Sequence, residues 1–197
     1  MLLYLHGFNS APSSTKAQQV AAYWAQHFAE PVAIPTLAVD PRIAFESAFT
    51  LAQETLERGQ PLRLIGSSMG GFLATHLLET LQPKYPQAVI QAVLINPAVT
   101  PWLLIPQWVG EHINPYTGES FTVLPQFAEV LQQWAHPSQS YPGHYWVLVQ
   151  SGDEVLDYRE AVVQYQCCRL QVTAGGDHSY PNFAQQLPAI SQFFGLS

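Results

Sequence analysis

The clearest chemical signal in the sequence is the segment Gly66-Ser67-Ser68-Met69-Gly70. This G-x-S-x-G pattern follows a short apolar run and precedes a helical pattern, and in that context it forms a sharp turn that lifts the serine out of a sheet. Glycine is needed at both ends of the turn because larger side chains would collide there. Ser68 is therefore the predicted nucleophile. The other use of such a turn, a phosphate site at a helix N-terminus, is disfavoured because the G-x-x-x-x-G-K-[ST] pattern is absent.

A serine hydroxyl is a poor nucleophile until a base takes its proton. In enzymes with a G-x-S-x-G turn, the catalytic residues occur along the chain in the order serine, acid, histidine. Of the seven histidines, His178 alone follows the last predicted strand, in a glycine-rich loop, so it is the predicted general base. The histidines expected to have surface or structural roles are His27, His76, His112, His136 and His144.

The predicted acid is Asp153, which follows a strand-like run and a glycine turn. A carboxylate at that place could hold the imidazole in the right tautomer and stabilise the imidazolium. Asp157 and Glu154 remain alternatives, whereas Asp177 is too close in sequence to His178 to face it easily.

Acyl transfer also needs N–H donors for the negative charge that develops on the carbonyl oxygen. One donor is expected to be the backbone N–H of Met69, directly after the nucleophile. The other should come from the loop after the first strand, 6–10, and we select the N–H of Phe8. Gly7 would let that backbone turn toward the site.

Short apolar runs alternate with helical patterns along the chain, which favours parallel strands with helices on both faces of the sheet. The expected fold is α/β, a doubly wound and mostly parallel six-stranded sheet forming one domain over residues 1–197. In such sheets, sites form at the carboxyl ends of the strands. The predicted strands are 2–5, 31–37, 62–65, 88–95, 145–149 and 169–172, and the main helices are 13–28, 41–59, 72–81 and 183–194.

Residues 97–143 interrupt the alternation. This segment contains Trp102, Trp108 and Trp134 and several prolines, and 124–134 has a helical pattern. Connections of this length are usually functional, so we expect a cap over the site. The alternative is an insertion that packs on the edge of the sheet.

The composition excludes several kinds of partner. Only seven lysines and arginines are present, and the net charge is −7. Nucleic acids and anionic membrane surfaces both attract basic proteins, so neither is an expected partner. No apolar run reaches the roughly 18 residues of a membrane span.

The sequence favours a cytoplasmic location. The N-terminus has no positive region, and its apolar run ends at His6, which is too early for a signal peptide. The two cysteines, Cys167 and Cys168, are adjacent and form neither a disulfide framework nor a zinc cluster. They are expected to be buried thiols on a strand.

The sequence resembles the YqiA-like esterases, a family of short bacterial α/β-hydrolases, over nearly its whole length. The resemblance implies esterase or thioesterase activity, with Ser68, Asp153 and His178 as the catalytic residues. Met69 stands where leucine is common, which leaves the backbone donor intact. The segments that carry the resemblance are 4–10, 66–71, 96–99, 152–158 and 175–179.

These observations lead us to expect hydrolysis of carboxylic esters or thioesters of small to medium acyl chains, through an acyl-enzyme on Ser68. The expected partner is a small-molecule ester or thioester, and no metal or organic cofactor is implied. Two alternatives stay open. One is a small-ligand binding module on an inactive hydrolase scaffold, because a fold does not fix a function. The other is amide hydrolysis.

Overall fold

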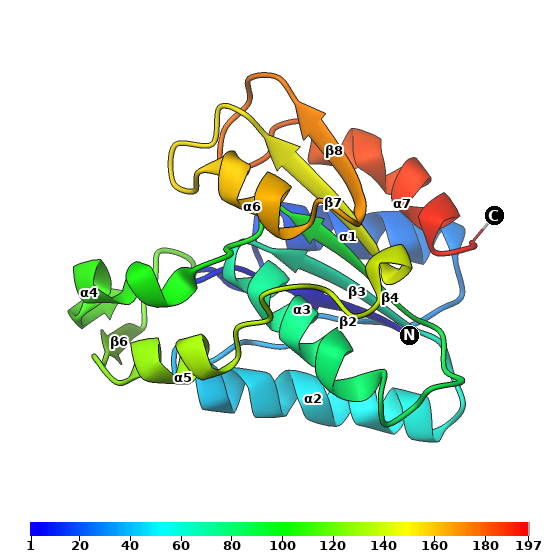
Figure 1. Ribbon diagram of the computed structural model, residues 1–197, viewed down its shortest axis with the longest axis horizontal. Helices are drawn as coiled ribbons and strands as arrows, with labels where there is room; N and C mark the ends of the chain where they lie inside the picture. Colours follow the sequence, from blue (N-terminus) through cyan, green and yellow to red (C-terminus); the bar gives the residue numbers. More distant parts are fainter. Residues whose placement is uncertain (197) are drawn as a thin grey trace.

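Six parallel strands form the central sheet in the computed structural model, which describes residues 1–196 (Figure 1). Their spatial order is β2-β1-β3-β4-β7-β8. The chain therefore starts in the interior of the sheet and extends toward both edges, which confirms the predicted doubly wound α/β class. The strands are β1 (Leu2–Leu5), β2 (Val32–Ala33), β3 (Leu62–Ser67), β4 (Ile90–Ile95), β7 (Tyr145–Gln150) and β8 (Arg169–Thr173).

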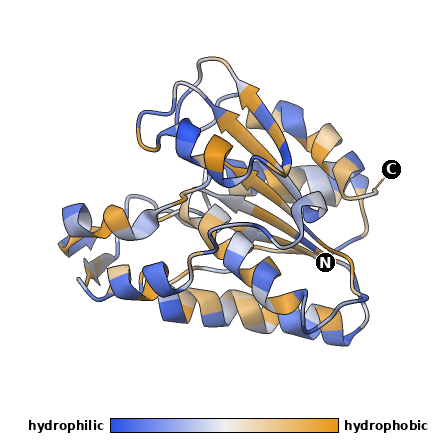
Figure 2. Ribbon diagram, in the orientation of Figure 1, coloured by the Kyte–Doolittle hydropathy of each residue, from blue (hydrophilic) through white to orange (hydrophobic). Residues whose placement is uncertain are grey.

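Helices cover both faces of the sheet, so its strands are apolar on both sides. One face packs against α2 (Pro41–Glu57), α3 (Met69–Leu81) and α6 (Tyr158–Gln164). The other packs against α1 (Thr15–His27) and α7 (Leu187–Phe193). Figure 2 shows the hydrophobic strands at the centre between helices of mixed hydropathy. The four residues of β1 are all buried, since neighbouring positions face opposite cores.

The pairing of β1 with β3 brings two loops to the same edge of the sheet. Leu5, at the end of β1, is the register partner of Gly66, near the end of β3. The chain that leaves β1 therefore lies beside the turn that holds Ser68. The strands β4, β7 and β8 end at this edge as well, because every pair in the sheet is parallel.

Most of residues 97–143 forms a separate layer of short elements beside this edge. The layer contains η1 (Pro101–Leu103), α4 (Ile105–Trp108), the antiparallel hairpin β5 (Gly110–Ile113) and β6 (Ser120–Val123), and α5 (Phe127–Gln133). The chain then returns to the amino ends of the strands, where η2 (Pro142–His144) leads into β7. In Figure 1 α4, β6 and α5 project to the left of the sheet. Phe72 of α3 packs with Ile105, Val123 and Phe127 in a small apolar cluster, which joins the layer to the main body.

Several boundaries differ from the sequence predictions for identifiable reasons. β2 has two residues instead of the predicted 31–37, because Pro31 and Pro35 flank it and proline cannot donate a ladder hydrogen bond. The predicted helix 183–194 is a 3₁₀ turn, η3 (Phe183–Gln186), followed by α7, whose first turn contains Pro188. The hairpin β5–β6 and the helix α6 were not predicted.

The cysteine prediction was wrong. Cys167 is exposed in the turn before β8, and Cys168 is half-buried next to it. Burial raises the pKa of the Cys168 thiol to about 11, so this thiol is protonated at neutral pH. Among the described helices, none is both long and apolar enough to cross a membrane.

Candidate active site

Ser68 lies on a strained turn between β3 and α3. Its φ is +55°, a value that is uncommon for residues other than glycine. The neighbouring backbones approach so closely that a Cβ on Gly66 would lie 2.3 Å from the Gly70 carbonyl oxygen, and one on Gly70 would lie 2.0 Å from that of Leu5. The G-x-S-x-G spacing is therefore a steric requirement of this turn, which holds the serine at the carboxyl edge of the sheet.

The structure brings Ser68, His178 and Asp153 together. The Nε2 atom of His178 lies 3.1 Å from Oγ of Ser68. The Nδ1 atom of the same ring lies 2.8 and 3.0 Å from the two carboxylate oxygens of Asp153. Because a carboxylate only accepts hydrogen bonds, Nδ1 carries the proton and Nε2 is free to accept one from the serine. Three residues distant in sequence thus form one hydrogen-bonded chain.

Asp153 is fixed by more than the histidine. Its Oδ1 accepts hydrogen bonds from the backbone N–H groups of Val155 and Leu156, each at 2.9 Å. Burial raises the pKa of Asp153, but the hydrogen bonds from His178 and from these two N–H groups outweigh it, so the net pKa is lower than usual. The side chain is only 2% exposed. Asp153 is therefore a buried carboxylate that stays ionised at neutral pH.

The alternative acids have other contacts. Asp157 caps α6 by accepting from the backbone N–H of Arg159, and it also forms an exposed ion pair with that side chain. Glu154 accepts from the backbone N–H of His178 at 3.0 Å, so it contacts the loop but not the ring. Among the three candidates, Asp153 alone hydrogen-bonds to the His178 imidazole.

Two buried amides hold the His178 loop in place, and sequence reasoning assigned no role to either. The Nδ2 of Asn96, just after β4, donates to the carbonyl oxygens of Asp177 (3.1 Å) and His178 (3.4 Å). Its Oδ1 accepts from the N–H of Gln150 at 2.9 Å, and the Gln150 side chain accepts from the N–H of Asp177 at 3.1 Å. The available signal was their position at strand ends, where parallel sheets place functional groups.

The two predicted N–H donors come from the residue after Ser68 and from the loop that follows β1, which lies beside Ser68. Neither the N–H of Phe8 nor that of Met69 has a hydrogen-bond acceptor within residues 1–196. The loop after β1 approaches closely, because a Cβ built on Gly7 would lie 3.7 Å from the Ser68 Oγ. Glycine at this position therefore leaves room beside the nucleophile. The arrangement leaves two N–H groups available to an anionic oxygen, and their role in an oxyanion hole stays a prediction.

His6 ties this loop to the segment after β2. Its ring is 3% exposed, and its Nε2 accepts from the backbone N–H of Leu37 at 3.1 Å. Nδ1 must then carry the proton, which it donates to the Gly7 carbonyl oxygen at 2.9 Å. Burial lowers the pKa of His6, which keeps the ring neutral and suits both bonds. His6 is a positioning residue for the loop that carries Phe8.

The layer that contains the hairpin β5–β6 also contacts this loop. The Phe8 ring packs edge-on against Trp108 and Phe121, with ring centroids 5.3 and 5.9 Å away. In addition, the Asn114 side chain donates to the Ser10 carbonyl oxygen at 3.0 Å. Residues 97–143 therefore contact the loop beside the nucleophile, which is what a cap would do, and their role as a cap stays a prediction.

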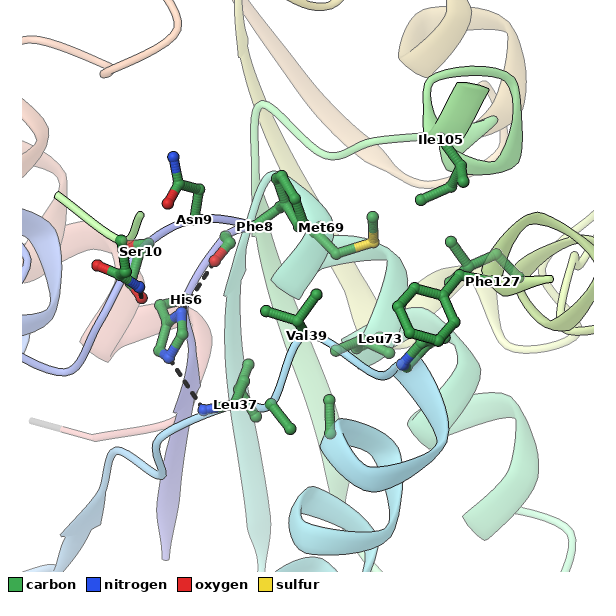
Figure 3. Close-up of a pocket in the computed structure, with 16 residues that line it drawn as sticks. His6, Phe8, Asn9, Ser10, Leu37, Val39, Met69, Leu73, Ile105 and Phe127 are labelled. Atoms are coloured by element: carbon green, nitrogen blue, oxygen red, sulfur yellow. Dashed lines mark hydrogen bonds between the residues drawn. The ribbon is translucent and has the colours of Figure 1, made fainter. Parts of the chain in front are cut away.

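Two cavities of different character meet at the loop 7–10. The first is narrow, with a volume of about 50 Å3, and its lining is largely apolar (Figure 3). The second lies over Ser68 and His178 and is larger, about 520 Å3, with a more polar lining. Figure 3 shows the side chains of Val39, Met69, Leu73, Ile105 and Phe127 around the apolar cavity.

The remaining histidines take no part in the hydrogen bonds that join Ser68, His178 and Asp153. His76 stacks on Trp134, and its Nδ1 lies 2.9 Å from Nε2 of His136. Burial, and next the nearby His136, lower the pKa of His76 to about 4, so this ring is neutral under ordinary conditions. Within residues 1–196, no group of three or more His, Cys, Asp and Glu side chains is arranged to hold a metal ion.

Solved structures share this fold and define its class. The monoacylglycerol lipase of Paleococcus ferrophilus is similar with a TM-score of 0.68 at 12% identity, over 100% of this chain and 94% of that one. Est1E from Butyrivibrio proteoclasticus gives 0.67 at 14% identity, over 98% and 86%. Mouse alpha/beta hydrolase domain-containing protein 10 gives 0.65 at 17% identity, over 98% and 88%. The fold is that of the α/β-hydrolases.

The family follows from the sequence itself. Residues 1–195 match the uncharacterised protein family UPF0227. The chain belongs to this family, and the predicted resemblance to the YqiA-like esterase family is confirmed.

Proposed function

We propose that the protein is a serine hydrolase that cleaves carboxylic esters or thioesters of small to medium acyl chains. The observation that carries the proposal is the hydrogen-bonded chain from Ser68 through His178 to a buried carboxylate, on a turn that exposes the serine. The hydrolases, esterases and lipases among proteins of this fold give it further support. The proposed reaction needs no cofactor.

In this mechanism His178 takes the proton as Ser68 attacks the carbonyl carbon. The N–H groups of Phe8 and Met69 stabilise the oxyanion, and each such donor contributes about 3–4 kcal/mol. His178 then protonates the leaving group, which departs and leaves an acyl-enzyme. Water enters, His178 takes its proton, and hydrolysis frees the carboxylic acid and Ser68. Asp153 stabilises the imidazolium in both halves of the cycle.

The narrow apolar cavity is the proposed acyl pocket. It adjoins both predicted N–H donors, since Phe8 and Met69 line it, and apolar side chains form most of its wall. An acyl chain gains about 0.8 kcal/mol for each CH₂ group that it buries. The small volume favours short chains.

Labelling with a fluorophosphonate tests the central claim. We expect the wild-type protein to form a covalent adduct on Ser68, identified by peptide mass spectrometry, because the reagent needs an activated serine. A panel of p-nitrophenyl and coenzyme A esters of increasing chain length then gives kcat/KM for each. Absence of both the adduct and turnover would favour a ligand-binding role instead.

Filling the apolar cavity should shorten the acyl chains that the protein accepts. We expect Val39→Trp to lower kcat/KM for the p-nitrophenyl butanoate ester roughly tenfold relative to the acetate ester, because two buried CH₂ groups contribute about 1.6 kcal/mol. The matched control is Val163→Trp, since Val163 is 68% exposed on α6. Equal losses on both esters would place the acyl chain elsewhere.

A further inference from the structure

The larger cavity contains a single strong cation. Lys16 is the only lysine or arginine among the residues that line it, and the nucleophile Ser68 and its base His178 line it too. The other lining groups include the polar side chains of Ser14, Gln19, Tyr116 and Asn182. A positive charge therefore shares one cavity with the proposed reaction centre, in a protein whose net charge is −7.

The ammonium group of Lys16 has unused hydrogen-bond donors. Its Nζ donates one hydrogen bond, to the Ser179 carbonyl oxygen at 2.7 Å. Within residues 1–196 no carboxylate lies within 4.0 Å of it, so it has no ion-pair partner. An ammonium group has three donors. Two N–H groups are thus left for water or for a ligand in the cavity.

Helix stability does not explain a lysine at this position. Lys16 is the second residue of α1, where the helix dipole is positive and cations are unfavourable. Burial lowers the pKa of Lys16, and the carboxylates of Asp177 and Asp153 act in the opposite direction and help to keep it charged. Both burial and the helix dipole disfavour a positive charge here, so its presence indicates a binding role.

The carboxylates near Lys16 accept hydrogen bonds from other N–H groups and not from its ammonium group. Glu154, which also lines the cavity, accepts from the backbone N–H of His178. Asp177 accepts from the backbone N–H of Ser179 at 2.8 Å, and Asp153 is held by the His178 ring. Asp177 and Asp153 raise the pKa of Lys16 by their charge, and none of the three carboxylates forms an ion pair with it.

We propose that Lys16 binds a negatively charged group, a carboxylate or a phosphate, on the leaving-group portion of the substrate. The proposal rests on the proposed function, because it assigns the two sides of the ester to two cavities. The narrow apolar cavity receives the acyl chain. The larger polar cavity, ten times its volume, receives an alcohol or thiol portion that carries the charge.

Two matched substrate pairs test the proposal, one for each anion. The carboxylate pair is the acetyl ester of 4-hydroxybenzoate and that of 4-hydroxybenzamide, which is neutral. The phosphate pair is S-acetyl-4′-phosphopantetheine and S-acetylpantetheine. The kcat/KM of each variant is compared with that of the wild type on the same substrate, so the intrinsic reactivity of the ester cancels.

We expect Lys16→Gln to lower kcat/KM at least tenfold on the charged member of one pair, or about 1.4 kcal/mol. The neutral member should change less than threefold, and Lys16→Arg should retain the preference for the charged one. High salt should reduce the wild-type preference, because it screens the charge. The pair that responds identifies the anion. The matched control is Lys84→Gln, since Lys84 is exposed beside Phe49 and is not among the residues that line the cavity.

Equal losses on charged and neutral members would overturn the proposal, because Lys16 would then only fasten the loop at Ser179. The same holds if Lys16→Gln leaves kcat/KM unchanged on both charged members. A failure of the proposed function is distinct from both outcomes: the wild type would hydrolyse none of the four substrates and would form no fluorophosphonate adduct.

Discussion

Ser68→Ala should abolish hydrolysis, with kcat lowered by about 10⁶-fold, the size of effect seen when a serine nucleophile is removed from such a hydrogen-bonded chain. The hydroxyl supplies the attacking oxygen, and no other side chain hydrogen-bonds to Nε2 of His178 in the described chain. The measurement is kcat on a p-nitrophenyl ester, together with loss of the fluorophosphonate adduct. Alanine retains a Cβ at the strained φ of +55°, so the turn should persist.

A control separates chemistry from folding in this experiment. Ser191 is a buried serine on α7, which packs against the other face of the sheet, and its hydroxyl donates to the Pro188 carbonyl oxygen at 2.8 Å. Ser191→Ala removes the same atom and should leave kcat within about twofold, since effects on distant sites are usually independent. Full activity in Ser68→Ala would end the proposed mechanism.

The sheet was predictable because its signals are local. Each buried parallel strand appears as a short apolar run, and the turn at Ser68 is set by glycines two residues to either side. Once parallel strands are inferred, their carboxyl ends must share one edge, which is why His178 and Asp153 could be selected from loops distant in sequence. The catalytic roles of these residues stay predictions.

Other features depend on contacts that no local pattern encodes. Asn96 and Gln150 matter because they reach a loop 81 and 27 residues further along, and Lys16 because α1 lies against the end of that same loop. Each strand of the hairpin β5–β6 has only four residues, so the alternation of Phe121 and Val123 with polar residues in β6 is too short to predict a hairpin. Cys167 is exposed because the strand β8 begins only at Arg169, after the turn.

Asp153→Asn should lower kcat by about 10³- to 10⁴-fold while leaving the shape of the side chain unchanged. An amide in place of the carboxylate can present its NH₂ group to Nδ1 of His178, which selects the opposite imidazole tautomer. Nε2 then carries a proton and can no longer accept one from Ser68. The amide oxygen can still accept from the N–H groups of Val155 and Leu156, so the loop should keep its shape.

Asp157→Asn is the matched control because it makes the same chemical change four residues away. Asp157 is exposed and contacts Arg159 rather than the imidazole, so this variant should keep kcat within about twofold. Both variants are compared by kcat on the same p-nitrophenyl ester and by thermal unfolding. If the two variants lost activity equally, or if Asp157→Asn lost more, the carboxylate that orients His178 would not be Asp153. A large loss confined to Asp153→Asn would instead mean that a buried, hydrogen-bonded carboxylate keeps the histidine basic toward the serine.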